Sequence, residues 1–240
     1  AKEYKEMFEY HKTKVVSVSK VMSDRLIKLG CPKDKIFYNT YGPADTFLSI
    51  QPTYTNCQFL SIGRFVEKKA PHLLLLAFKK VLEEFPKVNL VYAGDGKLLD
   101  SCKDLVKALH LENSVNFPGH ITPEDYCKLL KNTMAYVQHS IESHDGDMEG
   151  TPVSILEASG AGLPVVSTKH AGIPDVILNN ETGLLSDERN IEQMSENMMW
   201  ILRNRELAKK MGLAGKKRIS LKYSQQIHLD GLAKIINEAV

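Results

Sequence analysis

The stretch that decides the fold is QFLSIGRFVEKKAPHLLLLAFKKVLEEFPK, residues 58–87. Its first six residues include the apolar Phe59, Leu60 and Ile62, which predict a buried strand that ends at Gly63. A short polar loop follows, and Pro71 then lies where the first turn of a helix favours proline. Beyond it, apolar residues recur on one helical face, at Leu74, Phe78, Val81 and Phe85. The stretch therefore predicts one strand–loop–helix unit.

The same alternation of strand-like and helix-like segments continues along most of the chain. The runs are mostly apolar throughout, which is typical of parallel strands covered on both faces. Repeated units of this kind predict an α/β fold with a doubly wound parallel sheet and ligands at the carboxyl ends of its strands. Strands are expected at 14–19, 35–39, 58–63, 88–94, 114–119, 134–138 and 164–168, and helices at 70–87, 96–111, 122–132 and from about 190 onward.

Composition excludes several other classes of protein. The 240 residues are 43% hydrophobic, enough for the core of one domain or one and a half. Lys plus Arg (31) nearly balances Asp plus Glu (29), so no broad positive surface for nucleic acid is expected. The longest apolar run, 73–78, is too short to span a bilayer, and the N-terminus is too polar for a signal peptide. No C-x-x-C pair occurs among Cys31, Cys57, Cys102 and Cys127. We therefore expect reduced thiols and a cytoplasmic protein.

One domain boundary is visible in the sequence. Residues 39–56 contain two prolines, a glycine and many small polar residues, which is typical of a linker. The segment before them has room for only a strand, a helix and another strand. We therefore expect residues 1–45 to be the end of a larger unit plus a linker, and residues 46–240 to form the main domain, with a C-terminal helix over 221–240.

The loop after the strand at 58–63 is cationic. Arg64, Lys68 and Lys69 crowd at the carboxyl end of this strand, beside the N-terminus of the helix that begins at Pro71. Cationic side chains next to free helix N–H groups suit a phosphate or diphosphate. A lysine-rich surface loop is the alternative interpretation, and this loop taken alone favours it.

The stretch MEGTPVSILEASGAGLPVVS, residues 148–167, adds two carboxylates. Pro152 is expected in the first turn of a helix, with Thr151 as its N-cap. Helical side chains tilt toward the N-terminus, so Glu157 can reach the same site that Glu149 enters from the preceding loop. Carboxylates suit the hydroxyls of a sugar and a ribose, whereas the helix end and the cationic loop suit phosphates. Together they predict a nucleotide-sugar site; a solvated Glu157 is the alternative.

The Gly-Arg-x4-Lys loop and the Glu-x7-Glu element resemble the retaining glycosyltransferases of family 4. Their GT-B fold has two Rossmann-like domains, and further landmarks follow in order: VYAGDGKLL, VNFPGH and NNETGLL, with a C-terminal segment like the family's last helix. The resemblance implies the C-terminal, donor-binding half of a GT-B fold, preceded by the end of the N-terminal acceptor domain. The detailed sequences of these motifs are most similar to those of bacterial enzymes of surface (exopolysaccharide) synthesis. The implied reaction transfers a hexosyl-type sugar, with retention, from a nucleotide-diphosphate sugar to a glycan or lipid-linked acceptor.

The resemblance also implies a role for each matching residue. Arg64 and Lys69 would bind the diphosphate and stabilise it as it departs, and Glu149 would contact the transferred sugar; these three form the expected catalytic set. Glu157 would bind the ribose. No metal or other cofactor is expected, and UDP, GDP and ADP donors remain open. The other expected substrate-binding positions are Gly63, Gly150, Thr151, Pro152 and Val153 near the sugar and phosphates, and Pro118, Gly119 and His120 near the base.

Several features depart from the family pattern. Ala70 and Ala171 replace usual glycines, Asp175 replaces a usual glutamate, and QHS at 138–140 replaces a usual Pro-Ser ending; Ala171 is expected to narrow the sugar pocket. In this family the N-terminal domain carries most of the acceptor site and a catalytic histidine, and the segment before the linker is too short to form such a domain. The chain alone is therefore expected to be weakly active or inactive. The alternatives are a non-catalytic nucleotide-sugar binding module or one part of a split enzyme, and a lipid-linked acceptor would imply peripheral association with the inner face of the membrane.

Two other segments of the sequence raise rival chemistries. Asp145 and Asp147, with His139 and His144 nearby, could hold a divalent metal as in the GT-A glycosyltransferase fold, but an acidic, glycine-containing surface loop is the favoured interpretation. A dinucleotide-dependent oxidoreductase would need G-x-G-x-x-G, but Leu99 stands at the third glycine position. The remaining histidines are expected to be structural or solvated.

Overall fold

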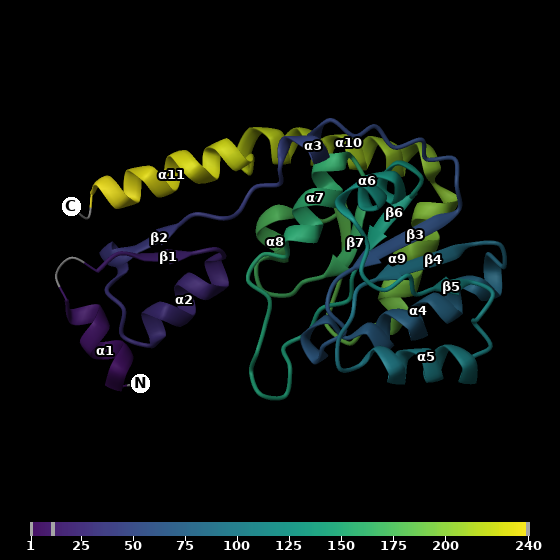
Figure 1. Cartoon of the computed structure of the whole chain (residues 1–240), viewed down its shortest axis with the longest axis horizontal. Coiled ribbons are helices and arrows are strands. Elements are labelled where there is room, and N and C mark those ends of the chain that lie inside the picture. The colour runs from purple at the N-terminus through teal and green to yellow at the C-terminus, as the bar shows by residue number, and fades with distance from the viewer. Residues whose placement is uncertain (1, 11–12, 239–240) are drawn as a thin grey trace.

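The computed structural model describes residues 2–10 and 13–238. Its strands form two separate parallel sheets, one of two strands and one of six (Figure 1). The six-stranded sheet has the order β5-β4-β3-β6-β7-β8, and every neighbouring pair is parallel. The strands are β1 (Val15–Ser17), β2 (Ile36–Tyr38), β3 (Gln58–Ile62), β4 (Asn89–Ala93), β5 (Val115–Asn116), β6 (Ala135–Val137), β7 (Val165–Thr168) and β8 (Gly183–Ser186).

The strand order creates a topological switch point in the large sheet. The chain runs outward from β3 through β4 to β5, and then returns to place β6 on the other side of β3. In open α/β sheets the ligand crevice opens at the carboxyl ends of the two strands where the order reverses. The predicted doubly wound parallel sheet is confirmed, and its crevice lies between the loops that follow β3 and β6.

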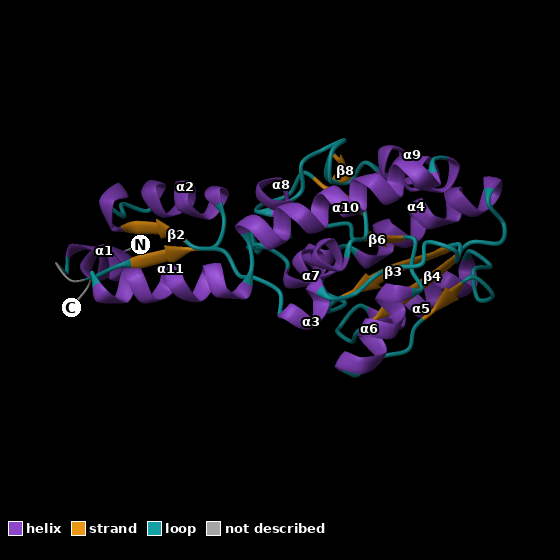
Figure 2. Ribbon diagram, turned by 90° about the horizontal axis from the view of Figure 1, so that it is seen from above, coloured by secondary structure: helices purple, strands orange, loops and turns teal. Residues whose placement is uncertain are grey.

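Helices cover both faces of this sheet, so the main unit has three layers (Figure 2). One apolar core packs α4, α5 and α9 against one face, and a second packs α3, α6, α7, α8 and α10 against the other. The helices, including two on the small unit and one at the C-terminus, are α1 (Lys2–Glu9), α2 (Lys20–Lys28), α3 (Asp45–Leu48), α4 (Pro71–Glu84), α5 (Leu99–Ala108), α6 (Pro123–Lys131), α7 (Val153–Ala161), α8 (Ile173–Val176), α9 (Ile191–Arg203), α10 (Arg205–Lys222) and α11 (Gln225–Asn237).

The predicted helix starts had mixed outcomes. Thr122 caps α6 as predicted, because its hydroxyl accepts a 3.1 Å hydrogen bond from the Asp125 amide. The prediction of Thr151 as N-cap of α7 was wrong. The cap position belongs to Pro152, and the Thr151 hydroxyl instead donates to the Val18 carbonyl oxygen at 2.7 Å. Thr151 thus joins the N-terminal segment to the main unit rather than closing a helix.

The C-terminal region is two helices with a break between them. The Ser224 hydroxyl accepts from the Ile227 amide at 3.2 Å and starts α11 at Gln225. The helix predicted over 221–240 therefore begins four residues later than expected, and residues 239–240 lie outside the described part of the chain.

The two-stranded unit is attached to the main unit at several points. In Figure 1, α11 runs from the large unit alongside β2, and the Asn39 side-chain amide donates to the His228 carbonyl oxygen at 3.0 Å. The α2 helix begins with a 2.8 Å hydrogen bond from the Lys20 amide to Asp175. The predicted linker, 39–56, contains the short helix α3, whose Phe47 ring lies 5.3 Å from that of Tyr126. The linker therefore lies against the main unit.

Candidate functional site

Two loops meet at the switch point. We call residues 63–70, after β3, the cationic loop, and residues 138–152, after β6, the acidic loop. The Ile141 amide donates to the Lys68 carbonyl oxygen at 2.9 Å, and the Lys68 ammonium lies 3.0 Å from the Asp147 carboxylate. The His144 amide donates to the Glu67 carboxylate at 2.7 Å. These contacts hold the two loops against each other at the carboxyl edge of the sheet.

The central contact between the loops joins two predicted catalytic residues. The Lys69 ammonium lies 3.1 Å from the Glu149 carboxylate, and their side chains are 13% and 9% exposed. Burial lowers the pKa of Lys69; the Glu149 carboxylate opposes this effect, while the charges of Lys68 and Arg64 add to it. A Cβ on Gly63 would lie 3.3 Å from Lys69 Cε, so the glycine lets the lysine cross over the backbone. Arg64 is exposed.

The backbone around Glu149 is fixed at consecutive residues. The Glu149 amide donates to His170 Nε2 at 3.0 Å, and the Gly150 carbonyl oxygen accepts from the Gly172 amide at 2.9 Å. A Cβ on Gly150 would come within 2.7 Å of the Val18 side chain, so this position accepts only glycine without rearrangement. The Thr151 bond to Val18 completes the series. Glu149 therefore enters the crevice on a tightly held segment.

Two helix N-termini face the same edge of the sheet. Neither α4 nor α7 has a side-chain hydrogen bond at its cap, where Ala70 and Pro152 respectively stand. Uncapped first-turn N–H groups, together with the positive end of the helix dipole, favour an anion. The cationic and acidic loops thus bring Lys69, Glu149 and the start of α7 together, as the sequence predicted for this part of the site.

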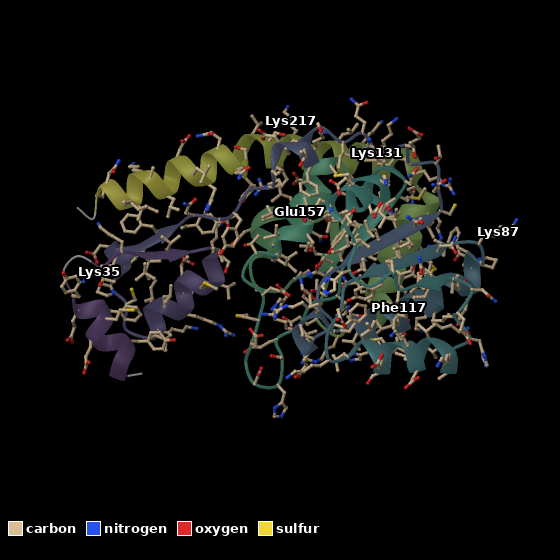
Figure 3. All side chains as sticks on the ribbon, in the orientation of Figure 1. Lys35, Lys87, Phe117, Lys131, Glu157 and Lys217 are labelled. Carbon is tan, nitrogen blue, oxygen red and sulfur yellow. The ribbon has the colours of Figure 1, made fainter. Side chains whose placement is uncertain are left out.

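Glu157 lies further along α7, at the side of a large cavity. Figure 3 labels it among the side chains of the main unit. Burial raises the pKa of the Glu157 carboxyl, whereas the neighbouring Tyr126 hydroxyl lowers it. The cavity has a volume of about 860 Å³, and its wall includes Ile62, Ile121, Thr122, Tyr126 and Glu157.

The segment predicted near the base lies beside this cavity, at the end of β5. The Gly119 carbonyl oxygen accepts from the Gly94 amide at 2.8 Å, and the exposed His120 ring lies 4.0 Å from Asp95. Residues that follow His120 form the cavity wall, whereas Pro118, Gly119 and His120 are not part of it. The structure therefore brings Glu157 together with Ile121 and Thr122 more directly than with the predicted Pro118–His120 segment.

The two aspartates of the rival metal hypothesis, Asp145 and Asp147, bind groups of the acidic and cationic loops. Asp145 accepts hydrogen bonds from the Ser143 hydroxyl at 2.5 Å and from the Asp147 amide at 3.1 Å, and Asp147 pairs with Lys68. Within residues 2–10 and 13–238, no three His, Cys, Asp or Glu side chains form a group that could hold a metal ion. These aspartates shape the acidic loop.

The two alanines that replace family glycines have left-handed backbones. Ala70 has φ 37° and Ala171 has φ 48°, a region that favours glycine. The preference for glycine at these positions is therefore a backbone requirement, which alanine meets at some cost in strain.

Sequence reasoning missed three side chains that support the site. His170 and Glu188 form a 2.6 Å contact behind Glu149, and Tyr126 meets Glu157 from α6. In the segment around His170, the sequence drew attention only to Ala171 and Asp175, which depart from the family pattern. A histidine two residues after a strand on the ligand edge was the one available signal, and its partner, 18 positions later, had none.

A doubly wound parallel sheet whose switch point carries a cation–carboxylate pair and an uncapped helix is characteristic of nucleotide-binding α/β domains, and here of the C-terminal half of a GT-B fold. Residues 52–218 match the family described as glycosyl transferases group 1. The chain belongs to this family.

Two curated relatives are named for the biosynthesis of polysaccharides. The putative colanic acid biosynthesis glycosyltransferase WcaL of Escherichia coli K12 is 29% identical over 199 residues, 82% of this chain and 49% of WcaL. The amylovoran biosynthesis glycosyltransferase AmsK of Erwinia amylovora is 27% identical over 238 residues, 98% of this chain and 58% of AmsK. The chain thus spans about half the length of the curated relatives it matches.

Solved structures share the fold at low sequence identity. TarM of S. aureus superimposes with a TM-score of 0.82 and 22% identity, covering 99% of this chain and 47% of TarM. HepE of Anabaena, in complex with UDP, gives a TM-score of 0.83 and 16% identity, covering 94% of this chain and 64% of HepE. The GT-B assignment is confirmed. Over the described ranges, no helix combines the length and apolarity needed to cross a membrane.

Proposed function

We propose that this chain is the donor-binding part of a retaining glycosyltransferase that uses a nucleotide-diphosphate sugar. The observation that carries the proposal is the Lys69–Glu149 pair at the switch point, beside the uncapped start of α7. A buried cation, a buried carboxylate and free helix N–H groups offer complementary partners for a diphosphate and for sugar hydroxyls. Relatives named for colanic acid and amylovoran biosynthesis support a role in surface polysaccharide synthesis.

In this proposal each charged residue meets a different part of the donor. Lys69, Arg64 and the first-turn amides of α7 bind the diphosphate, so that its growing negative charge is stabilised as the bond to the sugar breaks. Glu149 exchanges its contact with Lys69 for hydrogen bonds from sugar hydroxyls. No metal is needed for these contacts because the cations come from side chains.

Glu157 binds the ribose, and the base occupies the adjoining cavity. The pKa of Glu157 is raised by burial, so ribose hydroxyls would supply hydrogen bonds that its ionised form needs. The 860 Å³ cavity is large enough for a nucleoside, and its wall includes apolar Ile62 and Ile121. We therefore place the base nearer to Ile121 and Thr122 than to Pro118–His120. HepE is described in complex with UDP, which supports a uridine donor without excluding GDP or ADP.

Calorimetry with a panel of UDP-, GDP- and ADP-sugars tests this function. At least one nucleotide sugar should bind the 240-residue chain. Lys69→Ala should weaken it by tenfold or more, because a charge-assisted contact is worth about 1.5–3 kcal/mol. No binding at millimolar concentration would overturn the site. Binding unaffected by Glu157→Ala would overturn only the ribose role; Glu112→Ala, an exposed change away from the cavity, is the matched control.

The part that the chain plays in a whole enzyme is a separate element of the proposal. We assign residues 1–45 to the end of an acceptor-binding domain and its linker, and residues 46–240 to the donor domain. Because the chain spans 49% of WcaL and 58% of AmsK, transfer by this chain alone should be weak. A non-catalytic binding module is the alternative. Transfer that appears when the N-terminal half of a relative is fused to the chain favours the enzyme, whereas donor binding without transfer in the fusion favours the module.

A cytoplasmic location with peripheral membrane association fits a lipid-linked acceptor. Helix α10 carries seven basic residues and one acidic residue. Leu207, Leu213 and Leu221 on the same helix are 52%, 48% and 66% exposed. Basic charge with exposed leucines favours an anionic bilayer surface. Sedimentation with phosphatidylglycerol vesicles but not with phosphatidylcholine vesicles is expected, and loss of binding in Lys210→Glu/Lys217→Glu would assign it to α10.

A further inference from the structure

A buried histidine and a glutamate behind the acidic loop have no role in the scheme above. His170 follows β7 and is 1% exposed, and Glu188 follows the neighbouring strand β8. His170 Nδ1 lies 2.6 Å from a Glu188 carboxylate oxygen, and its Nε2 lies 3.0 Å from the amide nitrogen of Glu149. The imidazole thus links Glu188 to the residue proposed to contact the sugar.

The partners define the tautomer of His170. The Glu149 amide can only donate, so His170 Nε2 must accept with its lone pair. The remaining ring proton is then on Nδ1 and is donated to Glu188. The histidine is therefore neutral in this arrangement, and each of its nitrogens has one directed hydrogen bond.

The same pair also holds the other end of the loop. The second carboxylate oxygen of Glu188 accepts a 3.0 Å hydrogen bond from the Glu142 amide. The amides of Glu142 and Glu149 thus both end on one imidazole–carboxylate unit, which closes the intervening segment, residues 142–149. Within this segment the Ser143 amide donates to the Asp147 carbonyl oxygen at 2.9 Å, so the loop is compact as well as closed.

The fixed amide determines where the Glu149 carboxylate points. The side chain is buried and meets Lys69 at 3.1 Å, while the backbone of the same residue is held by His170. A small rotation of this backbone would move the carboxylate away from both Lys69 and a sugar on the donor. We propose that His170 and Glu188 are positioning residues that hold Glu149 in the orientation needed to bind the transferred sugar. This inference depends on the proposed donor function.

Two substitutions of His170 separate its two hydrogen bonds. In His170→Asn the amide nitrogen can replace Nδ1 toward Glu188, but nothing reaches the Glu149 amide. In His170→Gln the side-chain oxygen can replace Nε2 and accept from Glu149. Glu188→Gln is the third variant, because its single oxygen cannot serve both His170 and the Glu142 amide.

The decisive measurement compares a nucleotide sugar with its own diphosphate. The probes are UDP-glucose with UDP, GDP-mannose with GDP and ADP-glucose with ADP, and the pair that binds the unmodified chain is used. His170→Asn should weaken the nucleotide sugar about tenfold and the diphosphate less than about twofold, because only the sugar depends on Glu149. His170→Gln should recover most of the loss. A purely structural role would weaken sugar and diphosphate together.

A second measurement needs no ligand. Amide hydrogen exchange at Glu149 should become faster in His170→Asn, and at Glu142 in Glu188→Gln, with β4 unchanged. If the unmodified chain binds no probe, the proposed function and this inference both fail. If it binds a nucleotide sugar, this inference alone is overturned when the variants weaken sugar and diphosphate equally, or when exchange at Glu142 and Glu149 is unchanged. If His170→Asn does not fold, His170→Gln and Glu188→Gln decide by the same two readouts.

Discussion

The buried ammonium of Lys69 affects folding stability and diphosphate affinity in opposite directions as the pH rises. Burial lowers its pKa below the ordinary 10.5, so the folded chain releases this proton before the unfolded chain does. Between the two pKa values the unfolded state binds more protons, and stability rises with pH. The affinity for a diphosphate should instead fall as the pH rises, because binding requires the charged form of Lys69.

Affinity for a nucleoside diphosphate should therefore fall as the pH rises from 7 toward 10. Lys69→Arg should remove most of this decline, because a guanidinium keeps its charge throughout this range. Calorimetry at several pH values, with the diphosphate that binds best, provides the measurement. An equal decline in the arginine variant would assign the slope to another group and contradict the role of Lys69.

His139, which the rival metal hypothesis placed near Asp145 and Asp147, is a buried structural histidine. It is fully buried, and its Nε2 accepts from the Arg189 amide at 3.0 Å. Burial, with a smaller contribution from His72, lowers the pKa of His139 from 6.5 to about 4. The unfolded chain binds more protons between these values, so stability present above pH 6.5 is lost as the pH falls toward 4.

Acidification from pH 6.5 to pH 4 should cost about 3 kcal/mol through His139 alone. His139→Gln keeps an acceptor for the Arg189 amide and removes the titration, so its unfolding free energy should depend less on pH by that amount. Urea unfolding of both proteins across this range measures the difference. Parallel pH profiles would show that His139 does not carry the effect.

At the scale of elements, two glycines let α10 pack directly onto α7. A Cβ on Gly212 would lie 2.0 Å from the Gly162 carbonyl oxygen, and one on Gly215 would lie 2.7 Å from Ser159 Oγ. The first contact is with backbone, which cannot rotate away. The close approach places α7, and with it Glu149 and Glu157 at the crevice, on a rigid support.

Gly212→Ala should therefore destabilise the protein although alanine favours helices. Helix propensity contributes about 1 kcal/mol in favour of alanine, but overpacking against backbone should cost about 3 kcal/mol, a net loss of about 2 kcal/mol. Leu213→Ala, at an exposed position of the same helix, should change stability by about 0.5 kcal/mol or less. Chemical denaturation compares the two, and equal effects would contradict direct packing.

Sequence patterns identified most elements because long apolar runs and proline positions are local signals. Seven strands were expected close to where they occur, but β8 was missed because GLLS is short and contains no β-branched residue. The cap of α7 was assigned wrongly for a related reason. Thr151 has the right chemistry for an N-cap, but a distant partner, the Val18 carbonyl, binds its hydroxyl.

At the scale of the whole molecule, the site depends on contacts that no local pattern encodes. Arg64, Lys69, Glu149 and Glu157 could be named in advance because each lies in a recognisable motif. The pairing of Lys69 with Glu149, 80 positions later, follows from β3 and β6 being neighbours in the sheet. The His170–Glu188 contact likewise requires β7 and β8 to be adjacent. Such pairs become predictable only after strand order is known.

The small N-terminal unit likewise depends on contacts between residues that are far apart in the sequence. A two-stranded sheet is marginal by itself, and β2 gains its cover from α11. Asn39 binds the His228 carbonyl, the Tyr41 and His228 rings are 5.4 Å apart, and Ile235 of α11 is buried. The stability of β1 and β2 should therefore depend on a helix almost 190 residues away.

Truncation after Ser224 tests this dependence, since it removes α11 and leaves the buried Tyr223 in place. Amide exchange in β1 and β2 should approach that of an unprotected chain, because their cover is lost. Exchange in β3 and β4, which lie between covering helices, should remain slow. Ile236→Ala changes an exposed residue of α11 and should leave β1 and β2 protected. If β3 and β4 lost protection together with β1 and β2, the two sheets would form one cooperative unit, and α11 would stabilise the whole molecule.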